Sequence, residues 1–363
     1  MSVTAGNPMA PHLAGKKVLL TGGTGFVGRH LLPQLLAAGA EVTCLTRAVS
    51  RTGHLPQGVA TAQADLTTGA GLEQALQGKD VVIHMAALLF GLGWQDYLRA
   101  NALAARSMAS ALTRLSAQGE LGESFRFVLV SSLAATGPSG RAPGVNDATP
   151  AAPVSAYGWS KMLTEQVLGR ALGQSLVTLR PPIIYGSGDK GLLPVFKGVQ
   201  MAATAVSPGA GREFYVSAVH ATDMAQAVLC ACKPEARGAY HLSDGETYTM
   251  SDFCRGMGAA MDNVLNRAPR KVRIIRMPLP VMACTAGLST ALAVVADAVA
   301  NRLVGHGLRR PPAWNLDKYR EARQAGWLCD NSRICAELGF VPRVNLEAGM
   351  TEAIEGYRRE GWL

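Results

Sequence analysis

The sequence predicts an α/β protein in which a doubly wound parallel sheet is followed by a smaller C-terminal lobe. From Lys16 to about Leu179, short apolar runs of strand type alternate with helical stretches, as in the repeated βαβ units of a parallel sheet. After Gly186 this alternation stops, and glycines and prolines become frequent. We expect strands at residues 16–21, 41–47, 59–65, 81–86, 126–131 and 176–181, and helices near 26–38, 96–118 and 154–173.

The first expected strand runs directly into a glycine-rich turn and then into a helical pattern. Glycines at positions 22, 25 and 28 permit a tight turn, close approach of the backbone to a pyrophosphate and close packing of the helix. The helix N-terminus also presents free N–H groups to phosphates. Because strand, turn and helix open a βαβ unit, a dinucleotide site of Rossmann type is favoured over a plain glycine turn. The residues assigned to this site are Gly22, Thr24, Gly25, Phe26, Val27 and Gly28.

Tyr157 and Lys161 lie four residues apart, so in a helix they share one face. An ammonium beside a phenol favours the phenolate, and we therefore expect Lys161 to lower the pKa of Tyr157. Such a tyrosine exchanges a proton with an alcohol or carbonyl near neutral pH. Alone the spacing is weak evidence, because a solvated lysine beside a half-buried tyrosine produces it too.

Together, the glycine turn, the Tyr-x-x-x-Lys pair and six further segments resemble the extended short-chain dehydrogenase/reductases, also described as NAD-dependent epimerase/dehydratases. The segments follow the family order and cover most of the chain. By this resemblance, Ser132 is the catalytic serine, and Asn101 supports the active site. The resemblance also assigns the adenine-contacting pair Asp65 and Leu66, the cofactor-lining Ala86 and Ala87, and Pro181 and Ile184 beside the nicotinamide.

The resemblance also implies the chemistry. The cofactor carries the hydride, and the protein orients and polarises the substrate. Tyr157 exchanges the proton, Lys161 tunes Tyr157 and binds the nicotinamide ribose, and Ser132 holds the substrate oxygen. The neighbouring Ser131 is expected to point elsewhere, because strand side chains alternate, and to be satisfied by the backbone.

The end of the second strand, Thr46-Arg47, indicates which cofactor binds. NAD enzymes usually place an acidic residue here for the ribose 2′-hydroxyl, whereas a cation suits a 2′-phosphate. Arg47 is therefore a cofactor-binding candidate, and NADP(H) is preferred, with NAD(H) also allowed. The alternative is a solvated arginine in a surface loop.

Two departures from the family pattern argue against two of the family's reactions, dehydration and epimerisation. Leu133-Ala134-Ala135 follows Ser132 where dehydratases carry an acidic pair, and Ile183 stands where epimerases have a sugar-contacting asparagine. The remaining resemblance is to the 3β-hydroxysteroid dehydrogenase and dihydroflavonol reductase-like branch. The prediction is thus an NADP(H)-dependent oxidoreductase acting on a ketone or alcohol of an apolar small molecule. A nucleotide-sugar epimerase and a non-catalytic NADP-binding sensor remain as alternatives.

The 363 residues are too many for one small core. We expect a flexible lead over residues 1–15, an NAD(P)-binding Rossmann domain over 16–185 and a substrate lobe over 186–363. Segments near 219–243 are expected to return to the first domain. The C-terminal stretch from Asp317 onward is expected to carry no catalytic groups and to pack a final helix pair onto the lobe.

The composition limits the kinds of ligand, metal and partner that we expect. Seven cysteines without a Cys-x-x-Cys argue against a disulfide framework or a metal site and favour a reducing cytoplasm. The net charge of +9 is spread out and comes with no nucleic-acid motif, so a small molecule and not a nucleic acid is the expected ligand. Uncharged residues 277–296 suggest a lobe helix over an apolar pocket, peripheral membrane contact through 277–300, or a membrane span. The oligomeric state is left open, with a homodimer as one option.

Overall fold

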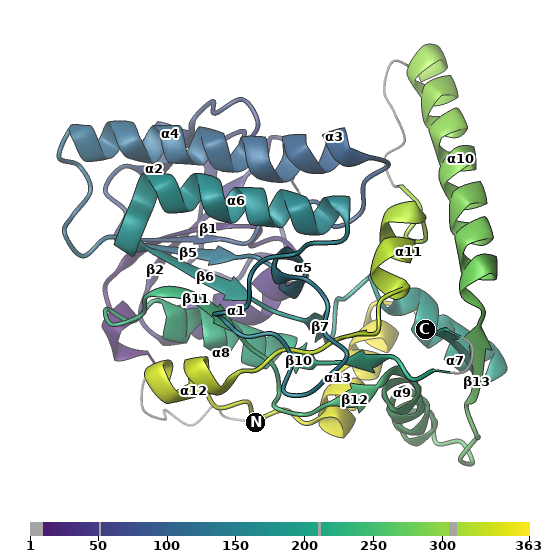
Figure 1. Cartoon of the computed structure of the whole chain (residues 1–363). Coiled ribbons are helices and arrows are strands. Elements are labelled where there is room, and N and C mark those ends of the chain that lie inside the picture. The colour runs from purple at the N-terminus through teal and green to yellow at the C-terminus, as the bar shows by residue number, and fades with distance from the viewer. Residues whose placement is uncertain (1–9, 51, 210–211, 305–310) are drawn as a thin grey trace.

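The computed structural model describes residues 10–50, 52–209, 212–304 and 311–363. Its centre is a sheet of seven parallel strands in the order β11-β6-β5-β4-β1-β2-β3 (Figure 1). The order reverses beside β1, which is where doubly wound sheets bind ligands at their carboxyl ends. The strands are β1 (Lys17–Thr21), β2 (Glu41–Thr46), β3 (Ala60–Gln63), β4 (Val81–His84), β5 (Arg126–Val130), β6 (Leu176–Arg180) and β11 (Gly238–His241).

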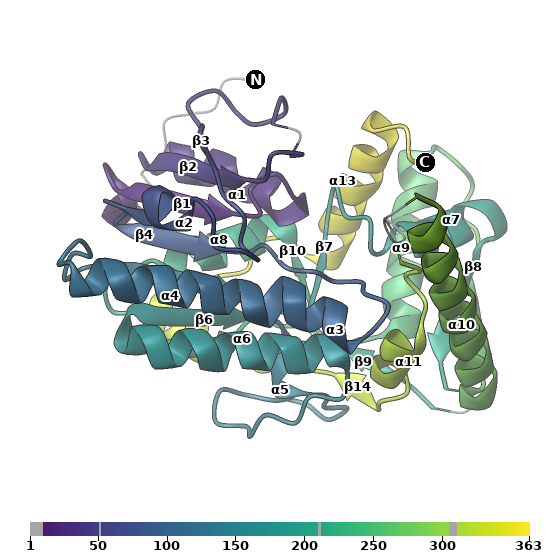
Figure 2. The same cartoon turned by 90° about the horizontal axis from the view of Figure 1, so that it is seen from above.

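Helices cover both faces of this sheet, because the strand side chains alternate between two apolar cores. Val18 and Leu20 of β1 face the core that holds α1 (Phe26–Ala37) and α8 (Ala221–Ala231). Leu19, between them, faces the opposite core. That second core holds α2 (Leu72–Leu76), α4 (Ala104–Ala117) and α6 (Ala156–Leu172), and Figure 2 shows α4 and α6 lying side by side.

Each strand range expected from the sequence contains a strand, and the segment near 219–243 returns β11 to the edge of the sheet. The short helix α2 was not expected. The prediction of a flexible lead over residues 1–15 is wrong from residue 10 onward. There η1 (Pro11–Leu13) forms a 3₁₀ turn, and Ala10 and Leu13 are fully buried in the core that holds α1. Residues 1–9 of that prediction lie outside the described residues.

The lobe has its own apolar core between helices and small sheets. In this core α7, α9 and α13 pack around β8 and around Tyr185, at the end of β7. Two-stranded pairs join β7 to β10 and β8 to β13, while β9 pairs with both β12 and β14. The bounds are β7 (Ile183–Tyr185), α7 (Leu193–Ala202), β8 (Thr204–Pro208), β9 (Tyr215–Val216), β10 (Ala218–His220), β12 (Tyr248–Thr249), α9 (Met250–Val264), β13 (Arg273–Met277), β14 (Gly326–Trp327) and α13 (Leu346–Arg359).

Three further helices follow β13 along the chain. They are α10 (Leu279–Val304), α11 (Leu316–Ala322) and α12 (Ser332–Leu338). The prediction of a final helix pair on the lobe is only half right. α13 packs there, but Ile334 and Leu338 place α12 in the core of the nucleotide-binding domain. In Figure 1, α10 stands at the outer edge of the lobe, on the side of α11 that faces away from the sheet.

Candidate active site

The glycine-rich turn follows β1, and Thr21, the last residue of β1, is hydrogen-bonded to the carboxyl end of β4. Thr21 Oγ1 accepts hydrogen bonds from the main-chain N–H groups of Met85 (3.2 Å) and Ala86 (3.1 Å), and it contacts His84 Nδ1 at 2.8 Å. Burial, assisted by the charge of Lys161, lowers the pKa of His84 to about 3. His84 is therefore a neutral bracing residue between two strands.

The glycines of the turn occupy positions that a side chain would obstruct. Gly22 has φ +78°, and a Cβ there would lie 2.9 Å from the amide nitrogen of Ala86. A Cβ at Gly28 would collide with the backbone of Gly23, because α1 packs directly on the turn. Gly25 is the N-cap of α1, so the first N–H groups of that helix, from Phe26 onward, point out of the turn without intrahelical partners. This cradle fits the pyrophosphate of a dinucleotide.

The remaining predicted cofactor residues lie around the same edge of the sheet. Arg47 follows β2 and is exposed, with its main chain held by Ser50. Asp65 is exposed too, and its carboxylate accepts from the N–H groups of Thr67 (2.7 Å) and Thr68 (3.1 Å). Its side chain therefore holds the turn after β3. Leu66 packs at the margin of the second core, Ala87 follows Ala86 beyond β4, and Ile184 lies in β7 paired with Val219.

Ser132 lies at the end of β5, where it becomes the N-cap of the single-turn helix α5 (Leu133–Thr136). Its Oγ accepts from the N–H of Ala134 at 3.1 Å, and it is hydrogen-bonded to the Tyr157 hydroxyl. Pro181 accepts the N–H of Leu133 at 2.8 Å, which fixes α5 to the end of β6. The serine is thus held by two strand ends and a helix start.

Tyr157 is in the first turn of α6 and is 8% exposed. Burial raises the pKa of its phenol, and the hydrogen bond from Ser132 opposes that shift. Lys161 is not among the groups that shift this pKa, so the expected lowering by its ammonium is wrong for this structure. The reason is geometric, since Lys161 Nζ donates to the carbonyl of Val130 at 2.8 Å.

Lys161 is 2% exposed, and burial lowers its pKa to about 8, with the carboxylate of Glu165 opposing the shift. Glu165 lies one turn further along α6 and is held by Arg180, whose Nη2 donates at 2.7 Å. The hydroxyl of Ser131 also donates to Glu165. Ser131 is therefore satisfied by a carboxylate and not by the backbone, which corrects the expectation. These contacts tie the ends of β5 and β6 to the helix that carries both predicted catalytic groups.

Asn101 supports this helix from the other side. It is 3% exposed and lies in η2 (Leu98–Leu103), a π-helical turn between α3 (Trp94–Tyr97) and α4. Its amide accepts from the N–H of Leu88 at 2.8 Å and donates to Ser160 Oγ at 2.9 Å. Insertions of this kind are common at functional sites. Here the π-turn aims Asn101 so that it links the loop after β4 to α6.

Ser132 and Tyr157 open into a cavity of about 370 Å³ between the sheet and the lobe. Most of its walls are apolar. Lys318 and Glu321 of α11 also line it, and they come from the C-terminal stretch that was expected to carry no catalytic groups. The lining residues are Ser132, Leu133, Ala134, Tyr157, Pro181, Pro182, Ile183, Pro208, Phe214, Val216, Met250, Lys318, Glu321, Ala322 and Trp327.

α11 is fastened to the start of the catalytic helix. The Asp317 carboxylate accepts from the main-chain N–H groups of Ala156 (2.6 Å) and Tyr157 (3.2 Å). The hydroxyl of Ser155, the N-cap of α6, donates to Glu321 at 2.7 Å. Lys318 Nζ bonds Glu321 at 3.0 Å and lies 4.7 Å from the centre of the Tyr157 ring. The sequence carried no signal for this arrangement, because Asp317 and Ala156 are 161 positions apart.

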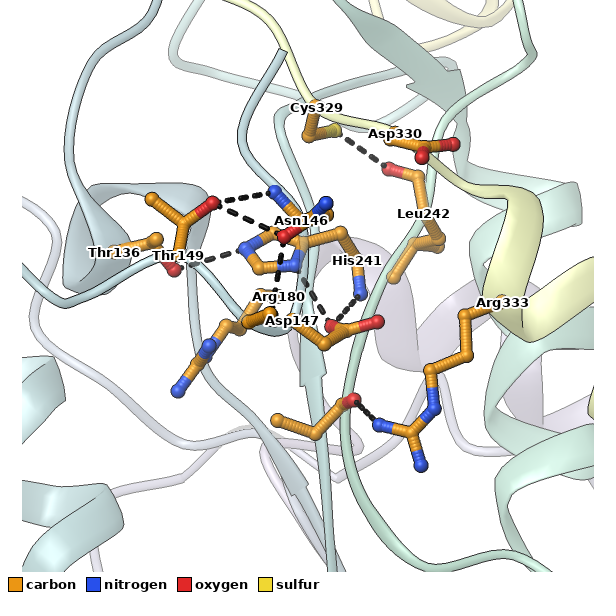
Figure 3. Close-up of polar contacts among 12 residues, drawn as sticks. Thr136, Asn146, Asp147, Thr149, Arg180, His241, Leu242, Cys329, Asp330 and Arg333 are labelled. Carbon is orange, nitrogen blue, oxygen red and sulfur yellow. Dashed lines mark hydrogen bonds and ion pairs between the residues drawn. The ribbon is translucent and has the colours of Figure 1, made fainter. Parts of the chain in front are cut away.

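A buried polar cluster behind α5 braces the same region (Figure 3). His241, at the end of β11, contacts Thr136 Oγ1 through Nε2 and Asp147 through Nδ1, both at 2.8 Å. The chemical types match a nucleophile, base and acid, but Thr136 and His241 are each 1% exposed. The cluster therefore acts as a brace that holds α5 and the loop after it against the sheet.

The helix α10 contributes no residue to the cavity lining within the described part of the chain. Residues 277–296 therefore do not cover this cavity, although Thr290 of α10 lines a second apolar cavity beside Trp94 and Trp159. Within the described ranges, no group of three or more His, Cys, Asp or Glu side chains could hold a metal ion.

Comparison with known proteins gives one family and several relatives. The family described as the NAD dependent epimerase/dehydratase family matches residues 18–242. The ceramide reductase of Caulobacter vibrioides (strain NA1000 / CB15N) is 32% identical over 353 residues, covering 95% of this chain and 96% of that protein. The sterol-4-alpha-carboxylate 3-dehydrogenase (decarboxylating) of Dictyostelium discoideum is 28% identical over 253 residues, covering 66% of this chain and 74% of that protein. The crystal structure of the Bordetella bronchiseptica enzyme WbmH in complex with NAD+ superposes with a TM-score of 0.71 at 20% identity, covering 95% and 99% of the two chains.

Proposed function

Because the chain belongs to the NAD-dependent epimerase/dehydratase family, we propose that it is an NADP(H)-dependent oxidoreductase that interconverts a ketone and an alcohol on a long-chain, ceramide-like lipid. The observation that carries this proposal is the position of Ser132 and Tyr157 at one end of a largely apolar cavity. The similarity to a ceramide reductase along nearly the whole of both chains supports the substrate class.

The residues of the site have separate roles in the reaction. When bound, the nicotinamide supplies or accepts the hydride at the substrate carbon. In reduction, the Tyr157 hydroxyl donates its proton to the carbonyl oxygen, and in oxidation its phenolate takes the proton back. The Ser132 hydroxyl donates a hydrogen bond to the same oxygen and stabilises the charge that develops there.

Burial of Tyr157 suits the proton-donor role. The desolvation that raises its pKa keeps the phenol protonated at neutral pH. The Lys161 ammonium, beside the end of β5, would bind the nicotinamide ribose. Ketone reduction is therefore the direction in which the resting protonation state is already correct.

The cofactor preference in this proposal rests on Arg47. The start of α1 would hold the pyrophosphate, and the exposed guanidinium after β2 would pair with a 2′-phosphate. Asp65 is the first acidic residue after Arg47 in the sequence, and its carboxylate already accepts two N–H groups of the turn that follows it. A cation without a competing carboxylate at the end of β2 favours NADP(H).

The cavity also indicates how a lipid would bind. Its volume of about 370 Å³ is near the lower end of ligand pockets, which span about 300–1,000 Å³. It therefore holds the reacting carbonyl and the first part of a chain, while the rest of the lipid extends through the opening. Lys318 and Glu321 would have to open their mutual 3.0 Å contact to bond the amide and hydroxyl groups of a ceramide head.

The nucleotide-sugar epimerase alternative fits this cavity less well. Among the described residues that line it, Lys318 is the single cation, and that cation is paired with Glu321. A nucleoside diphosphate would require more positive charge. The non-catalytic sensor alternative conflicts with the hydrogen-bonded Ser132 and Tyr157 beside a buried Lys161.

A cofactor-absorbance screen at 340 nm tests the proposal. Purified protein with NADPH or NADH is presented with short ketones, a 3-keto long-chain amide, a sterol ketone and UDP-sugars. We expect the fastest turnover with NADPH and the long-chain ketone. Interconversion of UDP-sugars without net NADPH consumption would identify an epimerase, and NADPH binding without turnover of any compound would identify a sensor.

A further inference from the structure

The helix α10 exposes several of its large apolar side chains on the surface of the protein. A surface helix normally turns its large apolar side chains toward the protein core. Here Leu288 and Leu292 are each 63% exposed and Leu303 is 77% exposed. The outer stripe, as we call this row of exposed large apolar residues, consists of Val281, Leu288, Leu292, Val295, Val299 and Leu303.

The spacing of the outer stripe is helical. Its members follow one another at steps of seven, four, three, four and four residues, so they lie on one face of α10. Another face packs on the protein, since Met282, Ala286 and Ala293 are buried there, whereas Val294 is 50% exposed away from the stripe. At a rise of about 1.5 Å per residue, the stripe is roughly 33 Å long.

Polar contacts fix which face of α10 points inward. Ser289 Oγ donates to the carbonyl of Trp314 at 2.7 Å, and Thr290 Oγ1 accepts from the N–H of Leu316 at 3.0 Å. The indole of Trp314 in turn donates to Thr285 Oγ1 at 3.1 Å. The stripe therefore cannot turn toward the core without breaking the contacts between α10 and the segment that leads into α11.

From this geometry we propose that α10 lies in the plane of a membrane and buries the outer stripe among the acyl chains of one anionic leaflet. By length and composition the segment Leu279–Leu303 could also cross a membrane. Its inner face, however, is held to the protein, and a spanning helix would have to give up Ser289 and Thr290 as anchors. While these contacts hold its inner face to the protein, α10 can enter a leaflet only with the outer stripe.

The charges near α10 suit an anionic surface. Arg302 is exposed at the edge of the stripe, and Arg273 is exposed in β13, the strand that leads into the helix. The whole chain carries a net charge of +9. Basic residues beside an exposed apolar helix face attract it to anionic lipid. A second copy of this chain, carrying the same charge, would gain no such attraction.

The position of α10 links this surface to the active site. α10 holds the start of α11 through Thr290, and α11 places Lys318 and Glu321 in the cavity wall. A helix docked in a leaflet would therefore keep the cavity next to the lipid phase. The membrane proposal itself rests on the stripe and not on the catalytic assignment, so it stands or fails separately from the proposed function.

Vesicle flotation with the full chain tests the proposal without any substrate. One set of vesicles contains phosphatidylcholine with a quarter phosphatidylglycerol, and the other contains phosphatidylcholine alone. We expect the wild-type protein to float with the anionic set. The double variant Leu292→Glu/Val299→Glu should bind at least about tenfold more weakly, because two aliphatic side chains no longer enter the acyl region.

A matched variant controls for the added charge. Met201 and Val341 are exposed by 83% and 57% and lie on α7 and before α13, so Met201→Glu/Val341→Glu adds the same two carboxylates elsewhere. This variant should float nearly as well as the wild type. Equal binding by both double variants would overturn the proposal. Sedimentation analysis provides the other decisive outcome: a wild-type dimer that ignores vesicles and becomes monomeric in Leu292→Glu/Val299→Glu would mean that a second copy covers the stripe.

Discussion

The N-terminal wall of the cavity, which carries Ser132, Tyr157 and Pro181, is built from the ends of neighbouring strands and the helix after them. The C-terminal wall, which carries Lys318, Glu321 and Trp327, is instead a short helix held to α6 by side chains and a two-residue strand paired with β9. The first wall is fixed by main-chain ladders and a buried core. The second depends on a few polar contacts with α6. We infer that the first wall performs the chemistry, and that the second contributes polar contacts to the substrate.

The largest effect should follow from a change in the N-terminal wall. Tyr157→Phe removes one hydroxyl at the edge of the cavity and leaves the packing of α6 intact. Turnover should fall by about 10²–10⁴, the usual range for a positioned acid or base. NADPH affinity and the melting temperature should stay near wild type. Near-normal turnover of a confirmed ketone by this variant would exclude the proton-transfer role of Tyr157.

The next largest effect should follow from a change at the cofactor-binding edge of the sheet. Arg47→Asp replaces a cation with a group that repels a 2′-phosphate, and charge-assisted hydrogen bonds are worth about 1.5–3 kcal/mol. NADPH should bind about 10- to 100-fold more weakly, and NADH affinity should stay similar or improve. Fluorescence titration of both cofactors measures this. Arg47→Lys is the control that keeps the charge, and if NADPH and NADH bind the wild type equally, Arg47 has no selective role.

The buried Lys161 makes cofactor binding depend on pH. Its pKa is lowered by burial to about 8, so the ammonium is present below that pH and is lost as the pH rises through it. NADPH affinity should therefore decline above pH 8, where the ribose loses its charged partner. Folding stability changes with pH in the opposite direction. Because the pKa of Lys161 is lowered on folding, the free energy of unfolding increases as the pH rises from about 8 to the unfolded pKa near 10.4. Lys161→Arg stays charged in this range, so its affinity should remain level with pH. A wild-type affinity that does not change between pH 7 and 9.5 would contradict the assignment.

The two walls also differ in what the sequence could reveal. The glycine turn, Ser132 and the Tyr157–Lys161 pair lie in contiguous segments whose spacing is tied to strands and helix starts, so their positions could be predicted. Local spacing could not show that Lys161 bonds the Val130 carbonyl, or that burial raises the pKa of Tyr157. Both depend on depth in the folded domain.

The C-terminal wall could not be predicted for a different physical reason. Asp317 meets the N-terminus of α6 only after the lobe has folded back across the sheet. Nothing in its own segment distinguishes this carboxylate from a solvated one. The outer stripe of α10 shows the same limit, because the sequence revealed an uncharged segment but not which of its faces packs on the protein.

Removing the clamp between the walls should have a moderate effect. Asp317→Ala leaves two N–H groups at the start of α6 without a carboxylate, a loss comparable to that of an N-cap, about 1 kcal/mol of unfolding free energy. Because Tyr157 is one of those two residues, kcat should fall as well. Denaturant unfolding and steady-state kinetics measure the two effects. Asp317→Asn keeps an acceptor and should recover most of both, and unchanged stability and kcat in Asp317→Ala would show that the clamp is dispensable.

The smallest effect should come from the polar group that faces the substrate in the C-terminal wall. Lys318 is about one-fifth exposed and is shared between Glu321 and the Tyr157 ring, so Lys318→Met removes a cation worth about 0.5–1 kcal/mol at such a site. KM for a ketone with an amide head should rise about two- to fivefold, and kcat should hardly change. A simple aliphatic ketone, which has no head group to contact Lys318, should show no change in KM. If kcat instead fell strongly for both substrates, Lys318 would belong with Tyr157 in the chemistry, and the division of labour between the two walls would fail.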